Sequence, residues 1–193
     1  MRAVSLRTLA TVIFPAGELV GPAGRTWITV VPARCHRGPG AHDQAKQLMA
    51  ELRELIHGIQ PQILTDLGLP AALGELADQS PIPVTVDSRL DGRLPGYIEN
   101  IAYFAAAEAL TNVAKHSGAT AATVSARLHG GLLTIEISDS GRGGADPGRG
   151  TGLTGLADRV AVADGRMLLS SPAGGPTVLR VEVPCPQSTP SSG

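Results

Sequence analysis

Apolar residues recur at three- and four-residue steps in three stretches of the chain, the spacing of an amphipathic helix. The stretches are residues 41–59, 95–115 and 153–163. In the first, the apolar positions are Ala45, Leu48, Met49, Leu52, Leu55, Ile56 and Ile59. Pro61 ends this helix, because proline breaks the helical hydrogen-bond ladder. A shorter helix is expected over residues 70–78, with Pro70 in its first turn.

Strand patterns lie between and after these helices. Residues 82–86 carry β-branched positions beside Pro83, which predicts an edge strand. Residues 120–128 and 132–138 flank two glycines and predict a β-hairpin, and residues 166–170 and 177–183 predict a second hairpin. The order of helices and strands predicts an α+β fold, with a mixed, mostly antiparallel sheet covered by helices on one face.

The two ends of the chain lack this patterning. Residues 1–41 are rich in glycine and proline and are expected to form an irregular arm, although residues 28–31 are compatible with a strand. Residues 185–193 are rich in proline and serine and are expected to be disordered. No apolar run approaches the ~20 residues of a membrane span.

Charge and cysteine content exclude several classes of protein. Sixteen basic against seventeen acidic residues give a net charge of −1, which argues against a generally basic nucleic-acid-binding protein. The two cysteines, Cys35 and Cys185, form no CxxC pair, which excludes a zinc ribbon or a disulfide framework. The chemistry must therefore come from local groups of polar residues.

One such group lies on the predicted helix 95–115. At about 100° per residue, Glu108, Asn112 and Lys115 fall within roughly 60° of one another, beside a buried side formed by Ile98, Ala102, Ala105, Ala109 and Val113. An Asn oxygen suits Mg²⁺, a Glu can accept a proton or orient a hydroxyl, and a Lys can neutralise phosphate. His116 is expected to be a packed residue. The alternative is a solvated helix flank with an i,i+4 polar pair.

A glycine-rich loop follows the strand that ends at Asp139. It spans residues 139–152 and leads into the N-terminus of a helix, where free N–H groups can bind phosphate. Asp139 could accept a hydrogen bond from an exocyclic amine such as that of adenine. The spacing is neither a P-loop nor the dinucleotide fingerprint. The alternative is a flexible surface loop with Asp139 as a turn residue.

Taken together, these pieces resemble a known superfamily. Glu108, Asn112, Lys115 and His116, then Asp139, Gly141 and Gly143, then Gly150, Thr151, Gly152 and Leu153 have the order and spacing of the N, G1 and G2 boxes of the GHKL ATPases. Residues 174–177 resemble the family's final turn. The resemblance covers residues 95–184 and implies a two-layer α/β sandwich of the Bergerat type.

The resemblance also implies ligands and roles. The ligands are ATP and Mg²⁺. Asn112 would hold Mg²⁺, Glu108 would be the catalytic residue that assists phosphoryl transfer, and Asp139 would recognise adenine. Lys115 and the turn formed by Gly150, Thr151, Gly152 and Leu153 would approach the phosphates. Gly141 and Gly143 would also be cofactor-binding residues, and Thr177 would lie near adenine.

Residues 52–61 and 64–69 are similar to the join between the dimerisation and catalytic domains of NarL/DesK-type sensor histidine kinases. Residues 42–60 then correspond to a remnant of the second dimerisation helix, and residues 61–184 to the catalytic domain. The apolar seam of residues 42–60 predicts a homodimer. The resemblance further implies a response regulator as partner and a cytoplasmic location, with a membrane anchor in the parent kinase left open.

The acceptor histidine of such kinases lies in a pattern like Glu-Leu-His-Asp, and none of the five histidines here occurs in it. His57 falls at the end of the second dimerisation helix instead. The expected reaction is therefore transfer of the ATP γ-phosphoryl to a histidine in trans or on a missing segment. Two alternatives stay open: an anti-sigma-factor-like serine kinase, and a non-catalytic module that binds nucleotide or a partner.

Overall fold

The computed structural model describes residues 18–20, 25–30, 61–147 and 152–185. Within these residues, seven strands form one sheet in the order β1-β2-β6-β7-β5-β4-β3. The strands are β1 (Glu18–Val20), β2 (Thr26–Val30), β3 (Val84–Arg89), β4 (Ala122–His129), β5 (Leu132–Asp139), β6 (Arg166–Ser170) and β7 (Thr177–Pro184). The helices are α2 (Gln62–Leu67), α3 (Leu69–Asp78), α4 (Gly96–Asn112) and α5 (Gly152–Val162), and α4 continues into a π-helical turn, η3 (Val113–Ser117).

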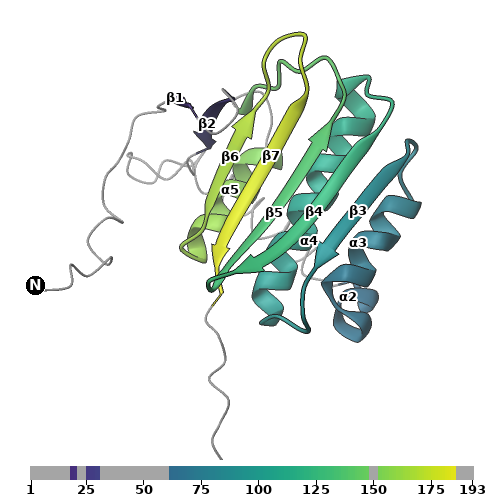
Figure 1. Cartoon of the computed structure of the whole chain (residues 1–193), viewed down its shortest axis with the longest axis vertical. Coiled ribbons are helices and arrows are strands. Elements are labelled where there is room, and N and C mark those ends of the chain that lie inside the picture. Colours follow the sequence, from purple (N-terminus) through teal and green to yellow (C-terminus); the bar gives the residue numbers. More distant parts are fainter. Residues whose placement is uncertain (1–17, 21–24, 31–60, 148–151, 186–193) are drawn as a thin grey trace, which may run out of the picture.

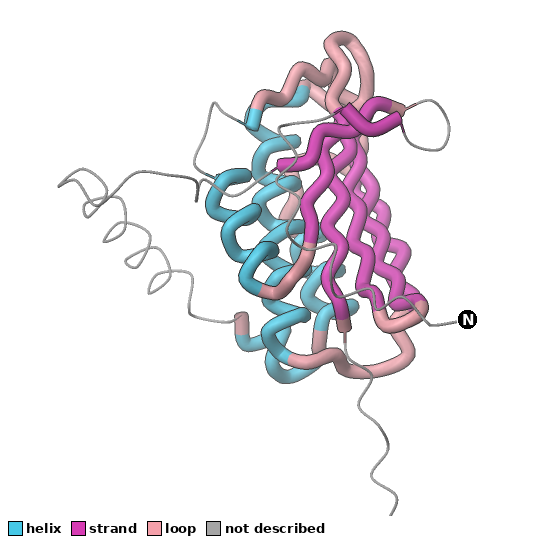
Figure 2. Tube along the Cα trace, turned by 90° about the vertical axis from the view of Figure 1, so that its left-hand side faces the viewer, coloured by secondary structure: helices cyan, strands magenta, loops and turns pink. Residues whose placement is uncertain are grey.

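The helices and the sheet form two layers. The four helices lie against one face of the sheet (Figures 1 and 2). Neighbouring strands are antiparallel except β3 and β4, which run parallel and are connected through α4. Both hairpins occur where the sequence predicts them, and β3 is an edge strand as expected. The predicted α+β fold with helices on one face is confirmed.

The core lies between the two layers. The side of α4 that the sequence predicted to be buried is buried, with Ile98, Ala102 and Ala105 fully inaccessible. Alanine at these positions leaves room for α4 to approach the sheet, where Ile135 and Val181 face it from the central strands. This close packing fixes the helix that carries the predicted polar group.

The segment expected to be an irregular arm contains two strands. Glu18–Val20 and Thr26–Val30 pair with each other, and β2 continues the sheet by pairing with β6. Trp27 is buried and packs with Leu168 and Val178 in a small cluster outside the main core. Residues 28–31 carry a local strand pattern that overlaps β2, but pairing with a strand about 140 positions later leaves no local signal, so the dense glycine and proline content dominated the prediction.

Other differences lie at element ends. Cys185 was placed in the disordered tail, yet it is buried, and its amide donates to the Gly131 carbonyl at 2.7 Å, which extends the contact between β7 and the β4–β5 turn. Helix α2 was not predicted because six residues are too few to show a period. The helix predicted over residues 41–59, the dimer contact of residues 42–60 and the rest of the tail lie outside the described residues. No described helix has the length and apolarity needed to cross a membrane.

Candidate nucleotide-binding site

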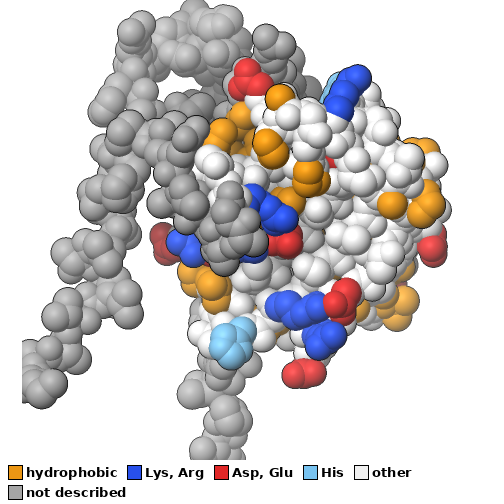
Figure 3. All heavy atoms as spheres, turned by 45° about the horizontal axis from the view of Figure 1, so that its top comes forward, with side chains coloured by type: hydrophobic (Ala, Val, Ile, Leu, Met, Phe, Trp, Pro, Cys, Tyr) orange, Lys and Arg blue, Asp and Glu red, His pale blue; other side chains and the backbone are white. Residues whose placement is uncertain are grey.

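A cavity of about 470 Å³ lies between α4, η3, the end of β5, the glycine loop, the start of α5 and strands β6 and β7. It belongs to the end of the molecule where the β6–β7 turn lies, which is the upper end in Figure 1. Hydrophobic, acidic and basic side chains are all visible when this end is brought forward (Figure 3). The predicted site residues that line the cavity are Glu108, Asn112, Asp139, Gly143, Gly152, Leu153 and Thr177.

Helix α4 supplies the two polar side chains of one wall. Glu108 and Asn112 are one helical turn apart, and the Asn112 Nδ2 group donates a hydrogen bond to Glu108 Oε1 at 3.2 Å. Because the amide nitrogen is used in this way, the Asn112 Oδ1 atom remains as an acceptor. The pair therefore offers a neutral oxygen next to a carboxylate, both of which are suitable ligands for a hard cation.

The π-helical turn η3 changes which residues follow Asn112 into the cavity. A turn closed by i→i+5 hydrogen bonds holds more residues than an α-helical turn. Each residue after Asn112 therefore rotates by less than 100° about the helix axis. His116 consequently lines the cavity, whereas Lys115 is exposed and is not among the lining residues. The regular-helix pattern placed Lys115 beside Glu108 and Asn112 and His116 among packed residues, and the structure differs at both positions. The approach of Lys115 to phosphate groups stays a prediction.

Asp139 is held at the end of β5. Its side chain is 5% exposed, and its Oδ1 atom accepts the Gly141 N–H at 2.6 Å. A side chain at Gly141 has no room, because a Cβ atom there would lie 2.7 Å from the Ser117 carbonyl oxygen. Gly141 therefore does not line the cavity itself but makes the tight turn that orients Asp139.

The glycine loop is joined to the β6–β7 turn. Gly143 has φ +60°, and a Cβ atom there would be 2.6 Å from the Gly175 carbonyl oxygen, so only glycine fits. On either side, Arg142 O accepts the Gly174 N–H at 2.7 Å and Ser171 O accepts the Gly144 N–H at 3.1 Å. These bonds fix the loop that forms one rim of the cavity.

Thr177 lies directly opposite Asp139 in the antiparallel pairing of β5 and β7. The hydroxyls of Thr177 and Ser171 are 2.9 Å apart, and Ser171 Oγ also accepts the Ala145 N–H at 2.9 Å. The sequence predicted both Asp139 and Thr177 as adenine contacts, and the sheet register brings them to the same wall. Their roles toward a ligand belong to the proposal below.

The start of α5 packs against Glu108. A Cβ atom added at Gly152 would overlap the Glu108 carboxylate. Leu153 lines the cavity beside it. Gly150 and Thr151, which were predicted to meet phosphate groups, lie outside the described residues.

Some lining residues were not predicted as part of the site. Arg142 and Ser117 line the cavity together with His116. Arg142 stands between the two predicted loop glycines, and this position was the available signal. Ser117 carried no signal, because its place depends on the π-helical turn and on the bond from the Arg142 N–H to its carbonyl at 3.0 Å.

The cavity suits a nucleotide with a bound cation. Its volume is within the range of about 300–1,000 Å³ typical of small-molecule sites. Its lining includes the buried Asp139, the apolar side chains Val113, Ile137 and Leu179, and the polar pair Glu108 and Asn112. Among the described residues, no group of three His, Cys, Asp or Glu side chains could hold a metal ion alone.

Comparisons with known proteins address the same region of the chain. No protein-family model matches it. The sensor histidine kinase MctS of Rhizobium johnstonii is 31% identical over 174 residues, which cover 84% of this chain and 37% of that protein. The oxygen sensor histidine kinase NreB of Staphylococcus carnosus is 31% identical over 147 residues, covering 72% of this chain and 42% of that protein.

A solved structure, the blue-light activated histidine kinase of Erythrobacter litoralis, superposes with a TM-score of 0.54 at 14% identity and covers 85% of this chain and 71% of that one. The fold is therefore that of a histidine kinase catalytic domain. The chain is homologous to NarL/DesK-type sensor histidine kinases, which confirms the resemblance drawn from its motifs. It spans less than half the length of the two relatives described.

Proposed function

We propose that this chain contains the Mg·ATP-binding catalytic domain of a two-component sensor histidine kinase. The observation that carries the proposal is the cavity that unites Glu108 and Asn112 of α4 with Asp139 of β5 and the first residues of α5. Homology to sensor histidine kinases supports it. The chain would transfer the γ-phosphoryl of ATP to a histidine supplied in trans or by another segment, because none of its own histidines occurs in the acceptor pattern.

In this proposal, Asp139 and Thr177 recognise adenine. The carboxylate accepts a hydrogen bond from the exocyclic amine, and the Gly141 N–H keeps it in place through Oδ1. Val113, Ile137 and Leu179 form the apolar wall against which the ring packs. A buried carboxylate selects adenine over guanine, because guanine presents a carbonyl oxygen at the corresponding position and would leave Asp139 without a donor.

The phosphates would lie toward Asn112 and the N-terminus of α5. Asn112 Oδ1 would hold Mg²⁺, which supplies charge neutralisation on the phosphate oxygens. Residues 150–153 would offer backbone N–H groups at the helix N-terminus. Glu108 would accept a hydrogen bond from the incoming imidazole and so orient its other nitrogen toward the phosphorus, which makes catalysis mainly positioning. Lys115 would act from the rim of the cavity.

Calorimetric titration of Mg·ATP into the full chain tests the nucleotide site. Asp139→Asn keeps an oxygen for the Gly141 N–H but replaces the acceptor for adenine, so we expect affinity to fall by at least about tenfold, the size of one charge-assisted hydrogen bond. Asp91→Asn changes an exposed carboxylate and should bind as the wild type does. A folded wild-type chain that does not bind Mg·ATP would contradict the proposal.

The chemistry of the product distinguishes the remaining alternatives. The chain is incubated with γ-labelled ATP and a dimerisation domain that carries an acceptor histidine. Acid-labile label on that domain supports a histidine kinase, since phosphohistidine is labile in acid and phosphoserine is not. Acid-stable label on serine would indicate the anti-sigma-factor-like kinase. Nucleotide binding without any transfer would indicate a non-catalytic module. A response regulator and a dimer through residues 42–60 remain further parts of the proposal.

A further inference from the structure

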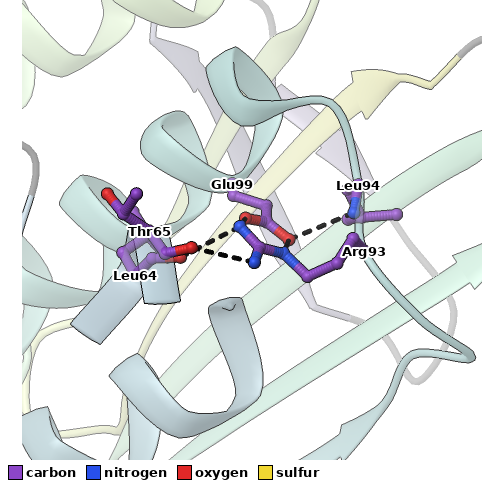
Figure 4. Close-up of polar contacts among 5 residues, drawn as sticks. All are labelled: Leu64, Thr65, Arg93, Leu94 and Glu99. Atoms are coloured by element: carbon purple, nitrogen blue, oxygen red, sulfur yellow. Dashed lines mark hydrogen bonds and ion pairs between the residues drawn. The ribbon is translucent and has the colours of Figure 1, made fainter. Parts of the chain in front are cut away.

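A charged cluster outside the cavity joins α2 to the first turn of α4. Arg93, in the segment before α4, donates from Nε to Glu99 Oε1 at 3.0 Å and from Nη2 to Glu99 Oε2 at 2.9 Å. The same guanidinium donates to the Leu64 carbonyl at 3.1 Å and the Thr65 carbonyl at 3.0 Å. Figure 4 shows it between the carboxylate on α4 and the two carbonyls on α2.

Each partner in this cluster depends on the others. Glu99 is 1% exposed, and a carboxylate so buried needs a paired cation with hydrogen bonds. The carbonyls in the last turn of a helix lack donors within that helix, and Arg93 supplies donors to two of those of α2. Gly68 has φ +81°, and a Cβ atom there would lie 2.9 Å from Arg93 Cδ, so glycine lets the arginine reach across. The cluster thus explains why positions 68, 93 and 99 hold glycine, arginine and glutamate.

Helix α2 has few other attachments. Of its six residues, only Leu64 is fully buried, Ile63 is partly buried against the core, and Leu67 is 66% exposed. No side chain caps its N-terminus at Pro61. The position of α2 therefore depends on Leu64 and Ile63, on its direct join to α3 at Gly68, and on the bonds from Arg93.

The cluster also lies between the start of α2 and the helix that carries two of the cavity residues. Pro61 lies two residues after the end of the amphipathic segment 41–59, whose apolar seam predicts a partner helix. Glu108 and Asn112 lie nine and thirteen residues beyond Glu99 on α4, which is about 14 and 20 Å along the helix axis. Glu99 and the two cavity residues thus belong to one helix, and a rigid helix is the kind of element that carries coupling between two sites.

We propose that Arg93 and Glu99 are positioning residues that couple the placement of α2, and hence of the chain before Pro61, to the placement of the cavity residues Glu108 and Asn112. The proposal rests on the nucleotide site proposed above. It requires α2 to have a docked and a released position, with nucleotide binding favouring the docked one. Since such coupling is reciprocal, occupation of the cavity must tighten α2, and fixing α2 must tighten binding.

Hydrogen exchange on the full chain tests this coupling. The amides of Leu64, Thr65 and Gly68, which donate to Pro61 and Leu64 carbonyls, report the docking of α2. In the wild type we expect a saturating, non-hydrolysable ATP analogue with Mg²⁺ to slow their exchange at least about fivefold, the lower end of typical coupling between sites.

The main variant is Arg93→Met with Glu99→Met, because replacing both members of a buried ion pair by apolar side chains preserves folding far better than removing one. Its sheet amides should remain protected and its cavity should still bind the analogue, but the response of the α2 amides should disappear. Glu99→Gln keeps an acceptor for Arg93 and for the Leu94 N–H and should retain part of the response. Arg89→Met, at an arginine that is 77% exposed, is the control and should respond as the wild type does.

The outcomes separate the two proposals. If the wild type binds the analogue but its α2 amides do not respond, or if the double variant responds as the wild type does, Arg93 and Glu99 are structural and the coupling is refuted. If the folded wild type does not bind the analogue by calorimetry, the nucleotide site itself is refuted and the coupling with it. A response lost in the double variant, reduced in Glu99→Gln and intact in Arg89→Met would establish the coupling.

Discussion

Gly152 is the first residue of α5 and lies against the Glu108 side chain of α4. It has no side chain, and the Glu108 carboxylate occupies the space that a Cβ atom would need. The conformation of Gly152 is not the reason for glycine here, because its φ is not in the left-handed region. The absence of a Cβ atom is therefore what permits a carboxylate to lie beside the first turn of a helix.

We expect Gly152→Ala to weaken Mg·ATP binding by about tenfold, because the methyl group must displace Glu108, whose Oε1 atom accepts the hydrogen bond that orients Asn112. Gly155→Ala is the matched control, since nothing lies within 4 Å of its Cβ position. It should bind normally and gain roughly 0.5–1 kcal/mol in stability, because alanine is the better helix former. Calorimetry and thermal unfolding of both variants measure this, and equal affinities would contradict the role given to Gly152.

At the scale of single elements, the end of α4 shows what a sequence pattern can and cannot predict. Periodicity predicted the helix and its buried side correctly, because the 3.6-residue spacing of apolar residues can be read from the segment itself. It failed after Asn112, because the π-helical turn depends on distant partners such as the Arg142 N–H bonded to Ser117 O. The prediction consequently placed Lys115 where the structure has His116.

Ser117 holds the π-helical turn from within. Its hydroxyl donates to the Val113 carbonyl at 2.8 Å and accepts the Ala119 N–H at 2.9 Å, and the residue is buried. We expect Ser117→Ala to lower the free energy of unfolding by about 1–2 kcal/mol through these lost bonds. Thr111→Ala, at an exposed position on α4, should change it by less than about 0.5 kcal/mol. Urea denaturation compares them, and equal midpoints would show that the turn does not need the hydroxyl.

The strands also differ in how far the sequence predicted them. The β4–β5 hairpin was predictable because Gly130 and Gly131 are adjacent to both strands and define the turn. For β2, the sequence indicated a possible strand over residues 28–31 but not its place in the sheet, because that place depends on pairing with β6 much later in the chain. For the cavity, motif spacing predicted the residues of α4 and β5, whereas the joining of the glycine loop to the β6–β7 turn required the tertiary structure.

At the scale of the whole molecule, three groups make stability depend on pH at opposite ends of the range. The hydrogen bond from Arg127 lowers the pKa of Asp87. Burial, followed by the nearby Glu75, raises the pKa of Tyr103, and burial raises that of Cys185. The folded state therefore favours an ionised Asp87 and a neutral phenol and thiol.

The direction of each pKa shift determines whether the folded state loses stability at low or at high pH. The contribution of Asp87 is present above its ordinary pKa of about 4 and is lost as the pH falls below it. The contributions of Cys185 and Tyr103 are lost as the pH rises through about 8.5 and 10, where the unfolded chain ionises first. We expect a plateau in the urea midpoint between about pH 5 and 8. Tyr103→Phe should flatten the alkaline decline, and Tyr97→Phe, at a half-exposed position, should not; identical alkaline declines would contradict the role of burial.

The position of the last strand has a consequence for how the domain is made. Strand β7 is the final element of the described chain, yet it lies in the middle of the sheet, between β5 and β6. A ribosome releases the N-terminal part first, so β5 and β6 emerge as two separate edges with unpaired backbone groups. They can join only after residues 177–184 have emerged, because β7 bridges them with its antiparallel partners on both sides.

The cavity is completed only when β7 joins the sheet. One wall comes from α4 and β5, another from α5 and β6, and Thr177 and Leu179 of β7 complete it. A nascent chain therefore acquires its ligand site in the same step that closes its sheet, and a chain cut short before β7 would have neither. Exposed edges of this kind pair readily with other strands, so the interval before β7 emerges is when the growing polypeptide is most exposed to aggregation.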